Sequence, residues 1–472
     1  MLPNVYGAIT IVQWLGRGHD GPAAGSSAPR VRLAYLFYQI PGRARMTHSR
    51  LSKAAASLVA CFPLCALGAD FSVSGFGTLG YVQSNQPYAY QRFIDSGGTL
   101  KRDSVLGLQL DAKVSNDFGA TVQLKSAPSL SDDRRYEGSV SWAFLSYRPT
   151  NDLLLRVGKQ RLPLYLYSET YDVSATYAFA RLPAEMYTIS PSNDFNGVSL
   201  GRTVPLSNGD LSIDGFFGAT KTTFRLWLRG GPGQAAGPLF IDEDIKLGGV
   251  SIAYKPGTDT YRLNFGAAKL RRSDGEQFDR TYPFVTIGPG IGYYQVAPAL
   301  PGPGITTQRS LTFGVASLGV DFGVAGGFRI ISEMSRVWIP DVDISAASTR
   351  GYLSLLRRTG NWTPYVTYAA MRSASNVRDL YIGLSSNMVP NTIPGAALLN
   401  ASQRAGADSL IFYDQRSVSV GTSYRFSAKN VMKAEFMRTR IGQGSSLVDV
   451  PPLSDVRNQN INVFSVSYSF VF

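Results

Sequence analysis

The segment INVFSVSYSFVF at 461–472 alternates apolar and small polar side chains with a period of two. The apolar residues share one face and the serines share the other: Val466, Tyr468, Phe470 and Phe472 against Ser465, Ser467 and Ser469. This period predicts a pleated strand with one apolar and one polar face. Dense aromatics opposite small hydroxyls are typical of a barrel strand with lipid outside and water inside. Since single amphipathic strands also occur in water-soluble folds, the interpretation depends on whether the pattern recurs.

The pattern does recur along the chain. From Asp70 onward, sixteen segments have strand character: 71–83, 104–114, 119–126, 140–148, 153–160, 195–203, 210–221, 246–255, 259–270, 310–322, 325–338, 348–357, 361–371, 414–426, 430–441 and 461–472. Some of them alternate cleanly, such as 104–114, whereas 348–357 and 361–371 are ambiguous. The sequence therefore predicts an all-β fold with sixteen strands.

The gaps between these segments alternate in length. Those after even-numbered strands are short and contain turn-forming pairs: 115–118, 149–152, 205–209, 256–258, 358–360 and 427–429. Those after odd-numbered strands are mostly long: 84–103, 127–139, 161–194, 222–245, 271–309, 372–413 and 442–460, with a modest gap at 339–347. Short turns on one side, long loops on the other and an even strand count predict an outer-membrane β-barrel with both termini on the periplasmic side. A sandwich or propeller would not be expected to alternate its loop lengths so regularly.

The only long apolar stretch lies near the start, at 54–69, and is shorter than the roughly 18 residues that a membrane helix needs. With Arg50 and Lys53 before it and small residues at 66–68, it predicts a signal peptide at 46–68, with the mature chain beginning near Ala69. Residues 1–45 are then an upstream or disordered leader, and 69–472 the barrel domain. Two alternatives are a true N-terminal domain and a lipoprotein cleavage box ending at Cys61.

Removing 1–68 would also remove both cysteines and both histidines, and would lower the net charge from +13 to +7, because that segment carries seven Lys or Arg and one Asp. A mature chain of this kind has no disulfide, thiol nucleophile or histidine base. Its glycine patterns lead into no helix, so no nucleotide loop or other cofactor site is predicted. We therefore expect neither an enzyme, nor a metal or cofactor site, nor nucleic-acid binding. The acidic runs at 132–133 and 242–244 are expected in long loops as solvated charges, and the alternatives are that they bind a divalent cation or bridge lipopolysaccharide.

Several segments resemble the general diffusion porins of Gram-negative bacteria, as a divergent branch. The likeness covers almost all of 70–472 and is carried by FSVSGFGTLGYVQS, RDSVLGLQLDAKVSNDFGATVQL, WAFLSYRPTNDLLLRVGKQRLP and the terminal Phe472. It implies a sixteen-stranded outer-membrane barrel, commonly a homotrimer, surrounded by lipid and lipopolysaccharide. It also implies that the third long loop folds into the pore, and that the barrel assembly machinery reads Phe472. The segment 161–194 is richer in aromatics and less acidic than the inserted loop of the best-known members.

Charged residues fall into two groups that a pore would bring together. The segment after the fifth strand carries Arg161, Glu169, Asp172, Arg181, Glu185 and Asp194. Alternation places a second group on the water-filled face of the strands, opposite that segment: Asp111, Lys113, Lys125, Arg156, Arg262, Lys433 and Glu435. We predict that Lys125, Arg156 and the loop acids form the constriction. For each residue singly, a solvated charge with no special role is the alternative.

The predicted function is passive diffusion of small hydrophilic solutes or ions through this pore, with a weak preference for anions because basic residues outnumber acidic ones on the wall. The alternative is a structural or receptor barrel whose long loops bind a partner and whose lumen is plugged. A receptor of that kind is expected to carry a large plug domain before its first strand, and only 1–68 precede it here. This favours the channel.

Overall fold

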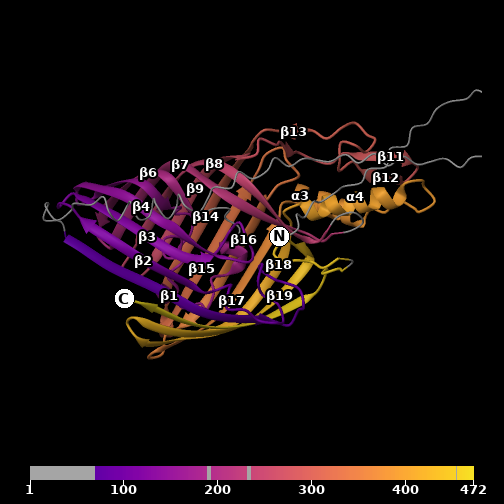
Figure 1. Cartoon of the computed structure of the whole chain (residues 1–472). Helices are drawn as coiled ribbons and strands as arrows, with labels where there is room; N and C mark the ends of the chain where they lie inside the picture. The colour runs from indigo at the N-terminus through magenta and orange to yellow at the C-terminus, as the bar shows by residue number, and fades with distance from the viewer. Residues whose placement is uncertain (1–69, 189–192, 231–234, 453) are drawn as a thin grey trace, which may run out of the picture.

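Sixteen antiparallel strands close into a single barrel in the computed structural model (Figure 1). The structure describes residues 70–188, 193–230, 235–452 and 454–472. The expected leader at 1–45 and the expected signal peptide at 46–68 lie outside the described residues. The predicted strand number and the all-β barrel are confirmed.

The barrel strands follow one another around the wall in chain order, each paired with the next. They are β1 (Asp70–Ser84), β2 (Val105–Lys113), β3 (Phe118–Pro128), β4 (Tyr136–Thr150), β5 (Leu153–Arg161), β6 (Asp194–Leu206), β7 (Gly209–Leu228), β8 (Gly237–Lys255), β9 (Thr260–Arg272), β14 (Leu311–Val324), β15 (Phe328–Trp338), β16 (Ser348–Arg357), β17 (Trp362–Ser373), β18 (Tyr413–Ser427), β19 (Asn430–Ser445) and β20 (Asn460–Val471). β20 pairs with β1, with Tyr468 opposite Leu79, so the sheet has no free edge.

Side chains alternate between the outer and inner faces of the wall. On β20, Phe464 and Tyr468 are exposed on the outside, whereas Ser465, Ser467 and Ser469 are buried on the inside. The two faces predicted for this strand are therefore confirmed. Leucines and aromatics are exposed in the same way around the barrel, for example Leu106, Leu108 and Leu110 on β2. A closed barrel with this apolar outer belt is the architecture of a multi-pass outer-membrane protein. Among the described residues no helix has the length and apolar character to cross a membrane.

One end of the barrel carries short turns and the other carries most of the long connections. Only two residues separate β4 from β5, and β6 from β7, and both Asp70 and Phe470 pair next to turns at this end. Two of the loops predicted to be long are not. The connection between β3 and β4 is reduced to 129–135, and most of 222–245 continues the β7–β8 hairpin. The strands run further than expected because their pairing continues beyond the predicted ends, from Lys221 with Asp244 to Leu228 with Gly237.

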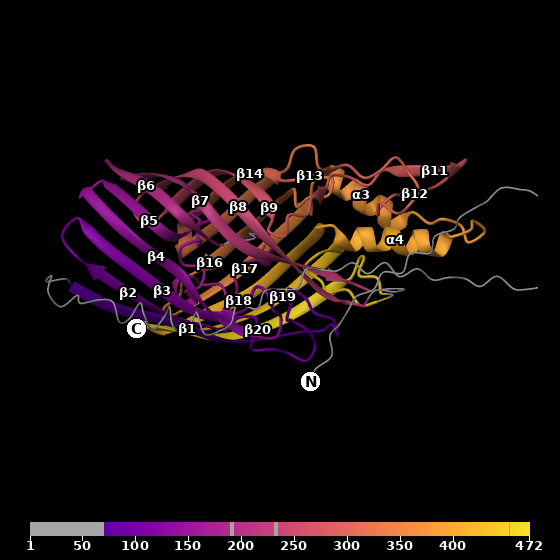
Figure 2. The same ribbon diagram turned by 45° about the horizontal axis from the view of Figure 1, so that its top comes forward.

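Two long connections fold into a cap beyond the loop end of β14–β18 (Figure 2). One, between β9 and β14, contains the short strands β10 (Phe278–Asp279), β11 (Phe284–Gly288), β12 (Ile291–Tyr294) and β13 (Thr307–Gln308). The other holds the helices α3 (Ser375–Ser386) and α4 (Ala396–Ser409). Buried residues of both helices pack with Tyr282 and Phe412 in one apolar cluster. The long gaps predicted at 271–309 and 372–413 are present, and they contain secondary structure that the sequence analysis did not assign. The remaining short elements are η2 (Ser174–Thr176), α2 (Ala184–Tyr187) and η3 (Ala325–Gly327).

Candidate functional site

The segment between β5 and β6, residues 162–193, contacts the inward-facing side chains of strands that lie far away in the sequence. Its aromatic and aliphatic residues pack against an inner surface formed by β15, β16 and β17. The buried residues of this contact are Tyr165, Phe179, Leu182, Met186 and Tyr187 from the segment, and Ile331, Tyr352, Leu356, Tyr365 and Ala369 from the wall. The aromatic richness of the segment, which the sequence shows, is used in this contact.

Glu333 on β15 holds the start and the end of the segment together. Its carboxylate accepts hydrogen bonds from the backbone N–H of Leu166 at 2.8 Å, from the hydroxyl of Tyr352 at 2.8 Å and from the hydroxyl of Tyr187. A buried carboxylate needs several donors to offset the loss of water, and these three supply them. The sequence analysis did not single out Glu333. The sequence feature that could have pointed to it is that it is the only acidic residue on the polar face of FRIISEMSRVW.

Lys433 and Glu435 on β19 bind the same segment. The Lys433 ammonium donates to the carbonyls of Ser174 and Phe179 at 2.5 and 2.9 Å and lies 4.3 Å from the centre of the Tyr177 ring. Glu435 accepts from the hydroxyl of Tyr365 at 2.9 Å. Both were predicted to face the segment across the lumen, and this is wrong. The alternation placed them inside correctly, but they lie on the wall against which the segment packs and are almost fully buried.

Three more predicted residues join this buried network. The Arg262 guanidinium donates to the Tyr165 carbonyl at 2.9 Å, and fully buried Glu185 accepts from Gln415 at 2.8 Å. Arg181 binds Asp103, in the β1–β2 connection, through two hydrogen bonds of 3.0 and 2.5 Å. Burial alone would raise the pKa of Asp103, but the ion pair with Arg181 outweighs it and lowers that pKa below its ordinary value.

A second charged cluster lies where the segment leaves β5. Asp172 binds both Arg161 and Lys125, with the Lys125 ammonium 3.0 Å from a carboxylate oxygen. The side chain of Arg161 is 2% exposed and that of Lys125 is 17% exposed. Asp194 at the start of β6 lies nearby, 3.5 Å from Lys159. The sequence analysis grouped Lys125 with the loop acids, and the structure brings it to Asp172.

Other charged residues on the inner side stay open to solvent. Arg156 and Glu169 approach to 4.0 Å, with side chains 36% and 51% exposed, and the Arg156 guanidinium lies 5.4 Å from the centre of the Phe144 ring. Asp111 accepts hydrogen bonds from Gln109 and Thr121 and is partly exposed. Lys113 is exposed beside the β2–β3 turn, away from this cluster. Among the predicted residues, those that stay open to solvent therefore lie on β2, on β5 and on the facing part of the segment.

The continuation of β7 and β8, which we call the cross-mouth hairpin (221–228 and 237–245), spans the loop end of the barrel. β7 is the seventh strand of the closed wall and β19 is the fifteenth of sixteen, so the two lie on opposite sides. Arg225 of the hairpin nevertheless binds Asp449, just after β19, through hydrogen bonds of 2.9 and 2.6 Å. The Trp227 indole donates to the Val450 carbonyl at 2.8 Å. The hairpin thus bridges the mouth, and nothing in the sequence pattern indicated it.

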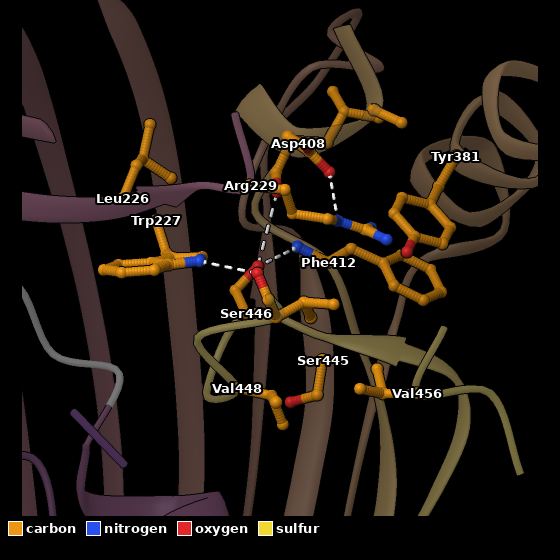
Figure 3. Close-up of a pocket in the computed structure, with 13 residues that line it drawn as sticks. Leu226, Trp227, Arg229, Tyr381, Asp408, Phe412, Ser445, Ser446, Val448 and Val456 are labelled. Carbon is orange, nitrogen blue, oxygen red and sulfur yellow. Dashed lines mark hydrogen bonds and ion pairs between the residues drawn. The ribbon is translucent and has the colours of Figure 1, made fainter. Parts of the chain in front are cut away.

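A third contact joins this hairpin to the cap. Figure 3 shows Arg229, at the end of β7, pointing at Asp408 of α4, with 2.6 Å between nitrogen and oxygen. Burial raises the pKa of Asp408 to about 6, although Arg229 opposes the shift. Burial also raises the pKa of Asp449.

The acids that were predicted to be solvated in long loops also differ from expectation. Asp133 binds Arg225 and Arg92, and the run at 242–244 lies within β8 instead of in a loop.

No family model and no curated protein matches the chain. Solved structures with a similar arrangement include a loop L8 deletion mutant of OmpT, an outer membrane protein of Vibrio cholerae, at 10% identity and a TM-score of 0.47, covering 86% of this chain and 99% of that one. The outer membrane channel DcaP of Acinetobacter baumannii is 12% identical with a TM-score of 0.46, covering 86% and 98%. The anion-selective porin from Comamonas acidovorans is 9% identical with a TM-score of 0.44, covering 86% and 100%. Because these identities and scores are low, the proposals below rest on the residues of this chain.

Proposed function

We propose that this barrel is a channel for passive diffusion of small hydrophilic solutes and ions, and not an enzyme. The observation that carries the proposal is the unequal distribution of charge inside the barrel. Charged residues on β9, β15 and β19 form hydrogen bonds that anchor the segment 162–193 to the wall. By contrast, Arg156, Glu169 and Asp111 stay exposed to water. A polar, solvent-facing strip of this kind is what a hydrated solute needs along its path.

In this proposal the segment 162–193 narrows the channel, and the gap between Arg156 and Glu169 belongs to its narrow zone. The two charges are opposite and close, so their field across the gap would orient dipolar solutes. Lys125, Arg262 and Lys433 are bound by the segment and contribute less to the field than their number suggests. The preference for anions is therefore expected to be small and to depend mainly on Arg156.

Recording from the purified barrel in planar bilayers tests the proposal. We expect stepwise conductance in symmetric salt, and a reversal potential in a salt gradient that moves toward cations in Arg156→Glu. Lys113→Glu is the matched control, because it makes the same change of charge at an exposed position beside the β2–β3 turn, away from Glu169. A barrel that inserts but conducts no current would favour the alternative, a structural or receptor barrel with a plugged lumen.

The assembly partners implied by the porin resemblance stay predictions. We expect a homotrimer in contact with outer-membrane lipid and lipopolysaccharide, and recognition of Phe472 by the barrel assembly machinery. Native mass spectrometry of the detergent-extracted barrel would give the subunit number directly. A monomeric mass under conditions that preserve known trimers would contradict the trimer.

A further inference from the structure

Five arginines lie on the outer face of adjacent strands at the loop end of β15–β19. They are Arg336, Arg372, Arg416, Arg438 and Arg440, and we call them the arginine stripe. Each shares its face with exposed apolar residues nearer the turn end, as Arg336 does with Met334, and Arg416 with Val418 and Val420. The stripe therefore points outward, away from the lumen, and begins where the apolar belt ends.

The strand register makes the stripe continuous. Arg336 on β15 lies opposite Thr349 on β16, which in turn lies opposite Arg372 on β17. Arg416 on β18 lies directly opposite Arg440 on β19. Like charges facing each other across a strand pair are unfavourable unless an anion lies between them.

Within the described residues, no carboxylate forms an ion pair with any arginine of the stripe. Arg440 has one 3.5 Å contact, with the amide oxygen of Asn458. Asp414 shares the outer face and is in register with Arg372, but it accepts a hydrogen bond from the Gln443 backbone. Five guanidinium groups thus face one carboxylate, and the stripe keeps a large positive excess.

The outer face of β7–β9, which β14 separates from β15, is different. There the loop ends of β7–β9 carry Lys221, Lys246, Lys269 and Arg271 together with Asp242 and Asp244. Lys221 and Asp244 form an ion pair of 3.2 Å, and Asp244 is in register with Arg271. On this side two carboxylates stand against four cations, and Lys246 and Lys269 face each other in register. The positive excess is therefore smaller here than on β15–β19, where one carboxylate stands against five arginines.

We propose that the arginine stripe binds the phosphate groups of lipids in the leaflet at the loop end of the barrel. An arginine on the lipid-facing side is tolerated at the membrane interface and not at the midplane, which matches the position of the stripe at the edge of the apolar belt. The planar guanidinium binds phosphate through two parallel hydrogen bonds, so neighbouring arginines can share one phosphate. Basic clusters at membrane interfaces recognise anionic head groups by this chemistry. The proposal does not depend on whether the lumen conducts.

Lipid A, a phosphorylated glycolipid, and its dephosphorylated form are suitable probes for the full barrel in detergent. The test variant is R372Q/R416Q/R440Q, and the matched control is K246Q/K269Q/R271Q, which removes the same number of positive charges from the outer face of β8 and β9. We expect native mass spectrometry to show lipid A bound to the wild type and the control. Binding to the stripe variant should be weaker by roughly tenfold or more, as expected for loss of charge-assisted hydrogen bonds.

Several results would overturn the proposal. Equal binding of dephosphorylated lipid A would show that phosphate is not recognised, and displacement of lipid A by inorganic phosphate would assign the stripe to free anions. Unchanged lipid binding together with a lower subunit number in the stripe variant would assign it to a contact between copies of the chain. Each variant is first checked for the heat-dependent gel shift of a folded barrel. If the triple variant does not fold, R416Q alone and the charge-preserving R372K/R416K/R440K are measured instead. Weaker binding is expected in both, with dependence on phosphate kept in the lysine variant, because lysine preserves the charge but not the paired hydrogen bonds.

Discussion

The ring of Phe472 lies directly over Gly75, and the two residues join the last strand to the first. Their backbones exchange two hydrogen bonds of 3.1 and 3.0 Å. A Cβ atom added to Gly75 would lie 2.3 Å from the Phe472 ring, so no other residue fits there without displacing it. Gly77 is covered in the same way by Phe470. A glycine in a strand leaves room for an aromatic ring from the neighbouring strand to lie over the backbone. Here these rings lie where the last strand pairs with the first and closes the barrel.

Gly75→Val should therefore destabilise the closed barrel. Overpacking of this kind costs about 1–3 kcal/mol, and the ring must move off the seam to relieve it. Thermal unfolding followed by the loss of the heat-dependent gel shift measures the effect. Gly138→Val is the control, because nothing lies within 4 Å of a Cβ added to this β4 glycine. Equal melting temperatures for the two variants would contradict the importance of the Phe472 contact.

Glu333→Gln should loosen the segment 162–193 while leaving the barrel folded. The carboxylate accepts from three donors, whereas an amide would point its own N–H₂ at one of them and leave that donor unpaired. Loss of one buried hydrogen bond costs about 1–3 kcal/mol, enough to populate displaced positions of the segment. Single-channel recording should show a noisier current with larger openings. Glu276→Gln, at an exposed position in the β9–β14 connection, should leave the current unchanged.

Glu169→Gln should increase the preference for anions, because it removes the exposed carboxylate that faces Arg156. The reversal potential in a salt gradient is the measurement, taken at low ionic strength, where screening is weak. Glu137→Gln offers a comparison, since this acid is exposed and lies close to the β3–β4 connection. A shift of equal size in both variants would mean that Glu169 is not part of the narrow zone.

Acidification should release the cross-mouth hairpin from α4. With its pKa near 6, Asp408 is charged at about pH 7 and protonated at about pH 5, and the ion pair with Arg229 is lost on the way down. The same protonation has the opposite effect on the global free energy of unfolding. A carboxyl whose folded pKa is raised adds stability below its unfolded pKa and loses it as pH rises through 6. The free energy of unfolding should therefore not fall over this interval, while the hairpin becomes more mobile.

Hydrogen exchange at Leu226–Leu228, compared at about pH 5 and pH 7 after correction for the intrinsic rate, reports the mobility of the hairpin. Asp408→Asn should make it equally mobile at both values. Arg404, 3.9 Å from Asp408, and Tyr381 of α3 also face this carboxyl and are kept unchanged. Protection that does not change with pH in the wild type would show that the other contacts, through Asp449 and Val450, hold the hairpin alone.

The sequence predicts the wall of this barrel well and its ends poorly, for physical reasons. Strands such as β20 can be predicted from the sequence because lipid outside and water inside impose a regular alternation of apolar and polar side chains. The cross-mouth hairpin extends beyond the apolar belt, so its pairing is not marked by such a contrast. α3 did leave a signal, with Val377, Leu380, Tyr381 and Leu384 at helical spacing, which the strand-based interpretation passed over.

For the interior of the barrel, too, the sequence predicts one aspect and not another. Alternation correctly turned Lys433, Glu435 and Arg262 inward, because a charge on the lipid face would be costly. It could not indicate which wall the segment 162–193 packs against, since that depends on contacts such as Lys433 with Ser174 that are distant in the sequence. Lys125 was grouped with the loop acids because alternation turned it inward, where the segment was expected to fold, and in the structure it binds Asp172.

The anchoring of the segment also orders events during assembly. The segment leaves the wall after the fifth strand, but its partners Glu333, Tyr365 and Lys433 belong to the eleventh, thirteenth and fifteenth. Contacts this distant in the sequence form late, after the intervening chain is in place. We therefore expect the segment to stay unanchored until β15–β20 have joined the wall. In the proposed channel, the strands that close the sheet would then also fix the final size of the pore.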